Sequence, residues 1–256
     1  AFKDTAAAIG YTSLIIENRF KDKLKAGEKI ETIVLASDHL IKKEAEFRKA
    51  ILKGAEEARE HGVIVTLGIK PSKPETGYGY IEVKDETMEL NSICKVRRFR
   101  EKPSLEVAES YLASGKYLWN SGMFIFTTET IFKNFEVLME EHTEIFNEIR
   151  KELKENLYGE ELSQIVKPYF EKFEKISVDF GIMEYSKNIR VIPVDIDWND
   201  IGSFNAFDEI FPKDENGNVV RGQKIRNLDS KDNIVISDDI EVSLLGVNDL
   251  VIVKET

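Results

Sequence analysis

The chain has 256 residues, of which 42% are hydrophobic and 32% charged, and its net charge is −11 at pH 7. This composition excludes a disordered chain and supplies enough apolar side chains for one large core with a small appended unit. The strongly negative charge argues against nucleic acid as a partner.

The first predicted element is an apolar helix over residues 6–16, with Asp4 or Thr5 as its N-cap. Small and apolar side chains cover so much of this helix that it needs a sheet on at least one side. No strand precedes it in the sequence. We therefore expect that residues before Ala1 in the natural protein supply the strands that this helix covers.

A strand–helix–strand unit follows. The continuous apolar run 31–36 predicts a buried parallel strand, residues 42–60 form an amphipathic pattern that Gly62 stops, and residues 63–69 predict a second buried strand. This spacing is typical of a right-handed crossover and predicts an α/β fold.

The middle of the chain is less regular. Alternating residues predict a hairpin of strands 78–83 and 92–99, and Ser104 predicts the start of a helix that ends near Ser114. The next predicted elements are a strand over 122–127, charged helices over 128–155 and 160–173, and a strand over 191–194. Pro193 limits that last strand to an edge or an irregular position.

After Phe211 and Pro212 the pattern changes to short β-rich segments separated by Asn and Asp turns. We therefore predict two domains, a core over residues 1–212 and a small all-β unit over residues 213–256. The sequence leaves open whether that second unit is complete.

The cysteine count and the lengths of the apolar runs indicate the cellular compartment of the protein. A single cysteine, Cys94, excludes an internal disulfide framework and favours a reducing compartment. No apolar run approaches the roughly 20 residues of a membrane span, and Lys3 and Asp4 interrupt any signal sequence. We predict a cytoplasmic protein without a membrane partner.

Two carboxylates are candidate metal ligands. Asp38 follows a predicted parallel strand, and ligands of open α/β sheets collect at the carboxyl ends of strands. Mg²⁺ takes one or two carboxylates together with substrate phosphates, and Asp200 offers the second carboxylate. The alternative is that Asp38 only caps the turn before the next helix. His39 borders this aspartate and could orient it.

Further polar candidates lie at strand ends. Lys102 would be a point charge for a phosphate and Glu101 an acceptor for hydroxyl groups, although such pairs are common on surfaces. Glycine at positions 77 and 79 permits a positive φ and a close approach of the backbone to a ligand. The alternative is that Gly77 and Gly79 form an ordinary turn. Asn120 either reads hydroxyl groups or forms an Asx turn.

Asp179 and two histidines complete the candidates. Asp179 either caps a helix over residues 180–186 or contacts a ligand. His61 and His142 are far apart in sequence, show no metal-ligand spacing, and are predicted to face solvent.

Six short motifs occur in order along the chain. They are Ala36-Ser37-Asp38-His39, Glu75-Thr76-Gly77-Tyr78-Gly79-Tyr80, Arg100-Glu101-Lys102-Pro103, Trp119-Asn120-Ser121-Gly122, Ser177-Val178-Asp179-Phe180-Gly181-Ile182-Met183-Glu184 and Trp198-Asn199-Asp200-Ile201-Gly202. Together they closely resemble the mannose-1-phosphate guanylyltransferases. The fourth and fifth motifs distinguish that family from glucose- and thymidylyl-type nucleotidyltransferases, which share its fold and the Glu-Lys-Pro motif.

The resemblance implies a Rossmann-like mixed sheet of the nucleotide-diphospho-sugar transferase type, followed by a small all-β unit of β-helix type. It implies an enzyme that makes GDP-mannose and pyrophosphate from GTP and mannose 1-phosphate, with Mg²⁺ as cofactor. The sugar phosphate would attack the α-phosphorus of GTP in line, so no nucleophile from the protein is needed.

The resemblance also implies roles for individual residues. The family pairs the positions of Asp38 and Asp200 on one metal ion, and with Lys102 these are the implied catalytic residues. Implied substrate contacts are Thr5 beside the base, in a segment where Asp4 replaces the family's usual Asn, and a sugar pocket of Gly79, Glu101, Asn120 and Asp179 beside the carboxylate pair.

One family feature is missing from the sequence. The family opens with a Gly-rich triphosphate loop that carries Arg and Lys, and no such loop occurs in these 256 residues. We expect the chain alone to be unstable and inactive. Two alternatives stay open: another sugar-1-phosphate nucleotidyltransferase, or a non-catalytic regulatory relative that binds sugar nucleotides. The resemblance leaves open whether the chain forms a homodimer.

Overall fold

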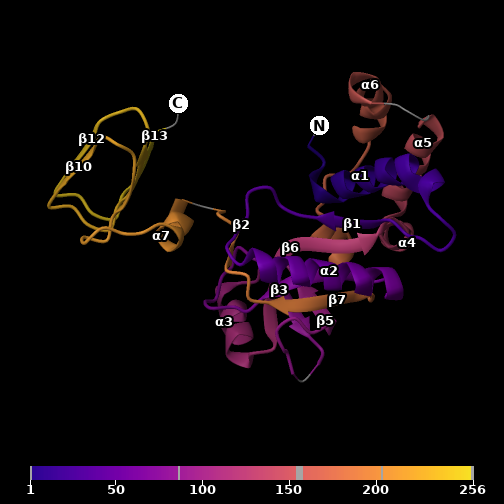
Figure 1. Ribbon diagram of the computed structural model, residues 1–256, viewed down its shortest axis with the longest axis horizontal. Coiled ribbons are helices and arrows are strands. Elements are labelled where there is room, and N and C mark those ends of the chain that lie inside the picture. Colours follow the sequence, from indigo (N-terminus) through magenta and orange to yellow (C-terminus); the bar gives the residue numbers. More distant parts are fainter. Residues whose placement is uncertain (1, 86, 154–157, 203, 255–256) are drawn as a thin grey trace. The chain divides into compact units, whose positions relative to one another are not determined.

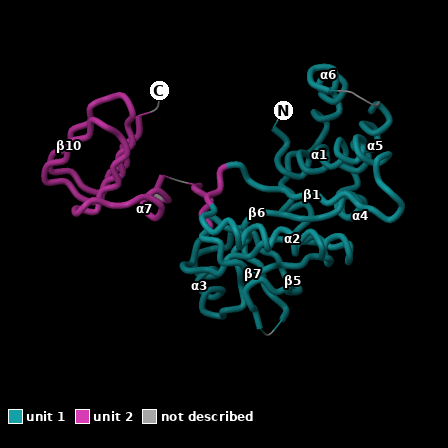
Figure 2. Tube along the Cα trace, in the orientation of Figure 1, with its two compact units in different colours: residues 1–37, 41–197 teal, residues 38–40, 198–256 magenta. Residues whose placement is uncertain are grey.

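The computed structural model describes residues 2–85, 87–153, 158–202 and 204–254 (Figure 1). It contains two compact units, one of residues 1–37 and 41–197 and the other of residues 38–40 and 198–256 (Figure 2). The second unit therefore begins at Trp198, earlier than the predicted boundary at 212, and it also takes in three residues from the start of the chain.

The first unit is a mixed α/β structure, as predicted. Its strands are β1 (Glu31–Val34), β3 (Ile64–Ile69), β4 (Tyr80–Val83), β5 (Cys94–Arg100), β6 (Tyr117–Thr127) and β7 (Ile189–Val194). Its helices are α1 (Asp4–Phe20), α2 (Glu44–His61), α3 (Leu105–Ser114), α4 (Thr128–Leu138), α5 (Glu140–Glu152) and α6 (Gly159–Phe170), with shorter helical turns η1 (Lys21–Lys23) and η2 (Asp179–Met183).

The six strands form one sheet in the order β1-β6-β3-β7-β5-β4. The β3–β7 pair is parallel, and the other pairs are antiparallel. β4 also pairs with the first part of β6, so this side of the sheet closes on itself. Strand β1 pairs on one side only among the described strands.

One predicted strand environment is wrong. β1 is half-buried and antiparallel to its neighbour, because β6 lies between β1 and β3. The crossover from β1 through α2 to β3 therefore keeps its parallel direction but skips a strand. β7 is an interior strand, but its pairing with β5 covers only Arg190 and Val191, so Pro193 lies at an irregular position where that ladder has stopped.

Helices cover both faces of the sheet. A Cβ atom on Gly54 of α2 would touch Ile125 of β6, so α2 packs closely on that face. The neighbouring residues Phe124 and Phe126 belong to the core shared with α1, α4 and α5, because successive strand side chains point to opposite faces. Figure 1 shows α1, α5 and α6 grouped together, with α2 across the strands from them.

Helix α1 buries its apolar face against α4 and α5. Its predicted cap is wrong: Lys3 is the N-cap and makes no side-chain bond, while Asp4 begins the helix with a φ of 67°. In the middle of the helix, a Cβ atom on Gly10 would collide with the ring of Phe146, which is fully buried. A side chain at position 10 therefore has no room.

Replacing Gly10 by Ala is expected to destabilise the fold. Alanine has the better helix propensity by about 1 kcal/mol, but overpacking a core commonly costs about 1–3 kcal/mol and here opposes that gain. The Phe146 ring is held between Phe135 and Phe173 and cannot easily move away. Thermal unfolding should show a lower Tm for Gly10→Ala, whereas Thr12→Ala, on the exposed side of the same helix, should leave Tm unchanged or slightly higher.

Several predicted helix ends agree with the structure. Gly62 is the left-handed C-cap of α2, with a φ of 60°. Ser104 is the N-cap of α3, but its side chain makes no capping bond. The predicted helix 128–155 is divided at Met139 into α4 and α5, and positions 154 and 155 lie outside the described residues.

None of the described helices has the length and apolar character needed to cross a membrane.

The second unit is mostly β structure, of the predicted β-helix type. Its strands are β9 (Val219–Arg221), β10 (Ile225–Leu228), β11 (Ile234–Ser237), β12 (Val242–Leu245) and β13 (Val251–Lys254), and they pair in parallel, β10 with β12 and β11 with both β9 and β13. The unit also includes η3 (Phe204–Ala206), α7 (Phe207–Ile210) and β8 (Trp198–Asn199), which pairs with β2 (Leu40–Ile41).

Buried asparagines join successive coils of this unit. The side-chain oxygen of Asn218 accepts from both the backbone and side-chain nitrogens of Asn233, and the oxygen of Asn233 accepts from the Leu250 amide. Both asparagine side chains are fully buried. These bonds satisfy turn backbone groups that the parallel strands leave unpaired.

Candidate functional site

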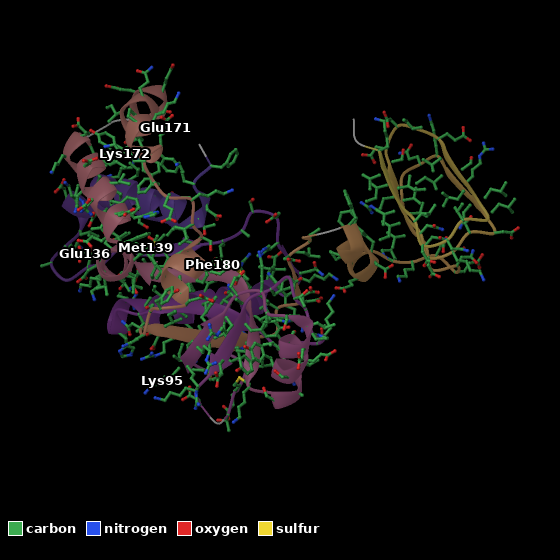
Figure 3. The ribbon with its side chains drawn as sticks, turned by 180° about the vertical axis from the view of Figure 1, so that it is seen from behind. Lys95, Glu136, Met139, Glu171, Lys172 and Phe180 are labelled. Atoms are coloured by element: carbon green, nitrogen blue, oxygen red, sulfur yellow. The ribbon has the colours of Figure 1, made fainter. Side chains whose placement is uncertain are left out.

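A cavity of about 1190 Å³ opens in the first unit. Among its lining are four predicted site residues, Thr5, Glu101, Lys102 and Asp179. Met139 and Phe180, both labelled in Figure 3, also line it. The predicted residues therefore meet at one hollow, although they come from a helix start, a strand end and the η2 turn.

Asn120 lies in β6 and connects this strand to η2. Its side-chain nitrogen donates to the Asp179 carboxylate at 2.9 Å, and its side-chain oxygen accepts from the Gly122 amide at 3.1 Å. The same oxygen accepts from the Thr66 hydroxyl at 3.3 Å. Sequence reasoning missed Thr66; a polar residue inside the buried run of β3 is the signal that could have found it.

Gly79 allows two parts of the site to approach closely. Its carbonyl accepts from the Asn120 amide at 2.8 Å, and a Cβ atom here would collide with the Glu101 carboxylate. Neither Gly77 nor Gly79 has a positive φ, so close approach and not backbone conformation requires glycine at position 79. Gly79 and Asn120 thus support the described lining of the cavity without being part of it.

Glu101 follows the end of β5 with its carboxylate against Gly79. One of its oxygens, Oε2, is buried and has no hydrogen-bond partner among the described residues. Burial, together with the charges of Asp179 and Glu184, raises the pKa of Glu101 to about 7, although the Lys102 ammonium opposes the shift. This carboxyl is therefore poised to change charge near neutral pH and to accept a ligand's hydroxyl group.

Asp179 begins the π-helical turn η2. Burial raises the pKa of Asp179, with a further contribution from the Asp4 charge, while the hydrogen bond from Asn120 acts in the opposite direction. The predicted capping alternative is not what the structure shows, because Val178 occupies the N-cap position and Asp179 lies inside the turn. The Asp179 side chain is turned toward Asn120 instead.

The start of α1 is joined to the segment before η2. The Thr5 hydroxyl accepts from the Val178 amide at 2.8 Å, and the Ala6 amide donates to the Ile176 carbonyl. These bonds place Asp4 and Thr5 on the cavity wall.

His142 is buried and does not face solvent as predicted. Its side chain is 2% exposed and lies among the rings of Phe135, Phe146 and Phe173. Burial lowers the pKa of His142, so the ring is held in its neutral form. The prediction failed because His142 lies three, four and seven residues before Ile145, Phe146 and Ile149, a helical spacing that places it on the buried side of α5.

The predicted metal ligands belong to the second unit and are described separately. Burial lowers the pKa of His39, while the charges of Asp38 and Asp200 act in the opposite direction. The Trp198 indole N–H donates to His39 Nδ1 at 3.1 Å, which leaves the imidazole proton on Nε2. The described residues contain no cluster of three or more His, Cys, Asp or Glu side chains suited to a metal.

Comparison with known proteins places the chain in a family. The model of the nucleotidyl transferase family matches residues 2–217, which include all the site residues named above. The chain belongs to the nucleotidyl transferase family.

Individual proteins similar to this chain have names that refer to mannose 1-phosphate. The chain is 37% identical over 254 residues to the mannose-1-phosphate guanylyltransferase of Klebsiella pneumoniae, an alignment that covers 98% of this chain and 51% of that protein. The crystal structure of mannose-1-phosphate geranyltransferase from Thermus thermophilus aligns with 100% of this chain and 70% of that chain, with 29% identity and a TM-score of 0.83.

A second solved structure, of mannose-6-phosphate isomerase from Helicobacter pylori, aligns with 78% of this chain and 72% of that chain, with 30% identity and a TM-score of 0.64. The chain spans about half the length of the curated relatives that it matches.

Proposed function

We propose that the protein containing this chain is a mannose-1-phosphate guanylyltransferase, which forms GDP-mannose and pyrophosphate from GTP and mannose 1-phosphate. The observation that carries this proposal is the assembly of Glu101, Lys102 and Asp179 at one cavity, with Asn120 bonded to Asp179 behind that lining, in a chain similar over 98% of its length to an enzyme of that name. Acceptors suit the sugar hydroxyls, and the ammonium suits the phosphate.

In the proposed reaction, a phosphate oxygen of mannose 1-phosphate forms a bond to the α-phosphorus of GTP. The bond from that phosphorus to the bridging oxygen breaks, and pyrophosphate leaves with the electron pair. The substrate supplies its own nucleophile, so the chain contributes position and charge. Lys102 would neutralise the sugar phosphate, while Glu101 and the Asn120–Asp179 pair would fix the sugar ring.

Mg²⁺ is part of the proposal. The charges of Asp38 and Asp200 both act on the pKa of His39, and Mg²⁺ is an ion that takes one or two carboxylates and completes its shell with phosphate and water. Asp38 and Asp200 would hold it. When bound, the ion would supply charge neutralisation and orientation at the phosphates.

We assign the reaction to the cytoplasm, since the single thiol, Cys94, is buried and free of any disulfide, as in proteins of reducing compartments.

The test is a substrate panel with the full-length protein. Pyrophosphate release is measured with each of four nucleoside triphosphates and with mannose, glucose and galactose 1-phosphates. We expect the highest kcat/KM for GTP with mannose 1-phosphate. A higher kcat/KM for another sugar phosphate would favour a different sugar nucleotidyltransferase, and binding without pyrophosphate release would favour a non-catalytic relative.

Affinity for mannose 1-phosphate is expected to depend on the ionisation of Glu101. The pKa of Glu101 is raised to about 7, so the carboxyl is protonated below that pH and becomes the better hydroxyl acceptor above it. Affinity should therefore rise as the pH increases from about 6 to about 8. Isothermal titration across this range measures the effect.

Glu101→Gln provides the matched control, because it keeps the shape and removes the titrating group. The remaining pH dependence in this variant belongs to the ligand phosphate. A parent protein and a Glu101→Gln variant with superimposable pH profiles would contradict the role of Glu101.

A further inference from the structure

The backbone at Lys102 is held in an unfavourable conformation. Lys102 has a φ of 43°, in the left-handed region that a residue with a Cβ atom seldom adopts. It also precedes Pro103, which further restricts its backbone. Such a conformation costs of order 1–3 kcal/mol and persists only where the surroundings enforce it. Something must therefore hold the turn that presents Glu101 and Lys102 to the cavity.

Glu184 makes a contact with this turn. Its Oε1 accepts a hydrogen bond of 3.3 Å from the backbone amide of Glu101, from 83 residues further along the chain. The Glu184 amide in turn donates to the Asp179 carbonyl at 3.0 Å. One residue therefore ties the strand end that carries Glu101 and Lys102 to the turn that carries Asp179.

Glu184 acts from behind the cavity wall. It is half-buried, and the described cavity lining includes Asp179, Phe180, Gly181 and Tyr185 but not Glu184. A residue in this place contacts the backbone of the site and not a ligand in the cavity. Its acceptor oxygen and its charge are two separable properties, because only the oxygen is needed for the bond to Glu101.

We propose that Glu184 is a positioning residue that fixes the Glu101–Lys102 turn next to Asp179. The carboxylates of Glu101 and Asp179 and the ammonium group of Lys102 can then contact the same ligand. The substrate part of this inference rests on the proposed function. The bond itself depends only on the fold.

Two conservative variants separate the effect of the Glu184 side-chain length from the effect of its charge. Glu184→Asp keeps the negative charge but shortens the side chain by one carbon–carbon bond, about 1.5 Å, which breaks a contact that is already 3.3 Å long. Glu184→Gln keeps the length and an acceptor oxygen but removes the charge. Glu109→Gln makes the same chemical change as Glu184→Gln at an exposed position of α3 and serves as the control.

The first measurement is amide hydrogen exchange at Glu101 and Lys102 in the full-length protein. We expect Glu184→Asp to lose protection at the Glu101 amide by about tenfold or more, while Glu184→Gln and Glu109→Gln retain it. Retained protection in Glu184→Asp would overturn the proposal. Thermal unfolding of each variant confirms that the exchange reports a local change.

The second measurement is turnover of mannose 1-phosphate with GTP. Glu184→Asp should lower kcat/KM by about 10- to 100-fold, because small misplacements of reacting groups have effects of this size. Glu184→Gln should stay within about threefold of the parent at pH 8, and its acid limb should move to lower pH, since the Glu184 charge is one of the groups that raise the pKa of Glu101. A loss in Glu184→Gln that is absent in Glu184→Asp would assign the effect to charge and overturn positioning by the bond.

Failure of the proposed function is distinguishable from failure of this inference. If the parent protein releases no pyrophosphate from GTP, the proposed function fails, but the exchange measurement still decides whether Glu184 holds the turn. If the parent is active and Glu184→Asp matches it in both exchange and kinetics, the inference fails alone.

Discussion

Replacing Lys102 by Met is expected to raise the KM for mannose 1-phosphate, and to lower kcat/KM by about 10²–10³-fold, because a preorganised cation opposite a reacting phosphate has an effect of this order. The Lys102 side chain lines the cavity and is exposed, so its removal leaves the core intact. Methionine keeps a similar length, and the left-handed backbone disfavours both residues alike. Stability should therefore change little while substrate binding changes greatly.

Steady-state kinetics of the full-length protein, with mannose 1-phosphate varied at saturating GTP, measure this effect. Lys116→Met makes the same change at an exposed position between α3 and β6 and should behave as the parent. An unchanged KM in Lys102→Met, with an unchanged melting temperature, would remove Lys102 from the phosphate site.

The second large effect is expected at the carboxylate pair. Asp200→Asn and Asp38→Asn should each lower kcat by about 10²-fold or more and raise the Mg²⁺ concentration needed for half-maximal activity, because each removes a charged ligand from a hard cation. Asp38 and Asp200 belong to the same unit, and the charges of both act on the pKa of His39. Loss of either should weaken binding of the same ion.

Direct binding provides the independent readout. Titration calorimetry with Mg²⁺, or paramagnetic resonance with Mn²⁺, should show weaker binding in both variants and unchanged binding in Asp239→Asn, which alters an exposed aspartate of the same unit. If Asp38→Asn and Asp200→Asn bind the ion as the parent does, the pair is not the metal site.

Local patterns in the sequence were enough for most elements. The amphipathic stripe over residues 42–60 predicted helix α2. Gly62 predicted where the helix ends, because a left-handed C-cap favours glycine. The alternation on both sides of an acidic loop predicted the β4–β5 hairpin. Short β segments after Pro212 predicted the coils of the second unit, because each segment carries its own turn residues.

Neighbours that are distant in sequence were beyond such patterns. Nothing in residues 31–36 indicates that β6 will lie beside them, and that insertion is what made β1 antiparallel to its neighbour. The rings around His142 come from three segments, so its aromatic contacts could not be read from its own helix. The interior position of β7, despite Pro193, depends on where the ladder with β5 stops.

The sequence by itself determined the site's residue types, because motif order and chemistry can be read without coordinates. Only the tertiary structure decided how they work together. The bond from Asn120 to Asp179 spans 59 residues and that from Glu101 to Glu184 spans 83, and each forms because the whole sheet brings those segments together. The raised pKa of Glu101 has the same origin, since burial and neighbouring charges are properties of the folded surroundings and not of the side chain.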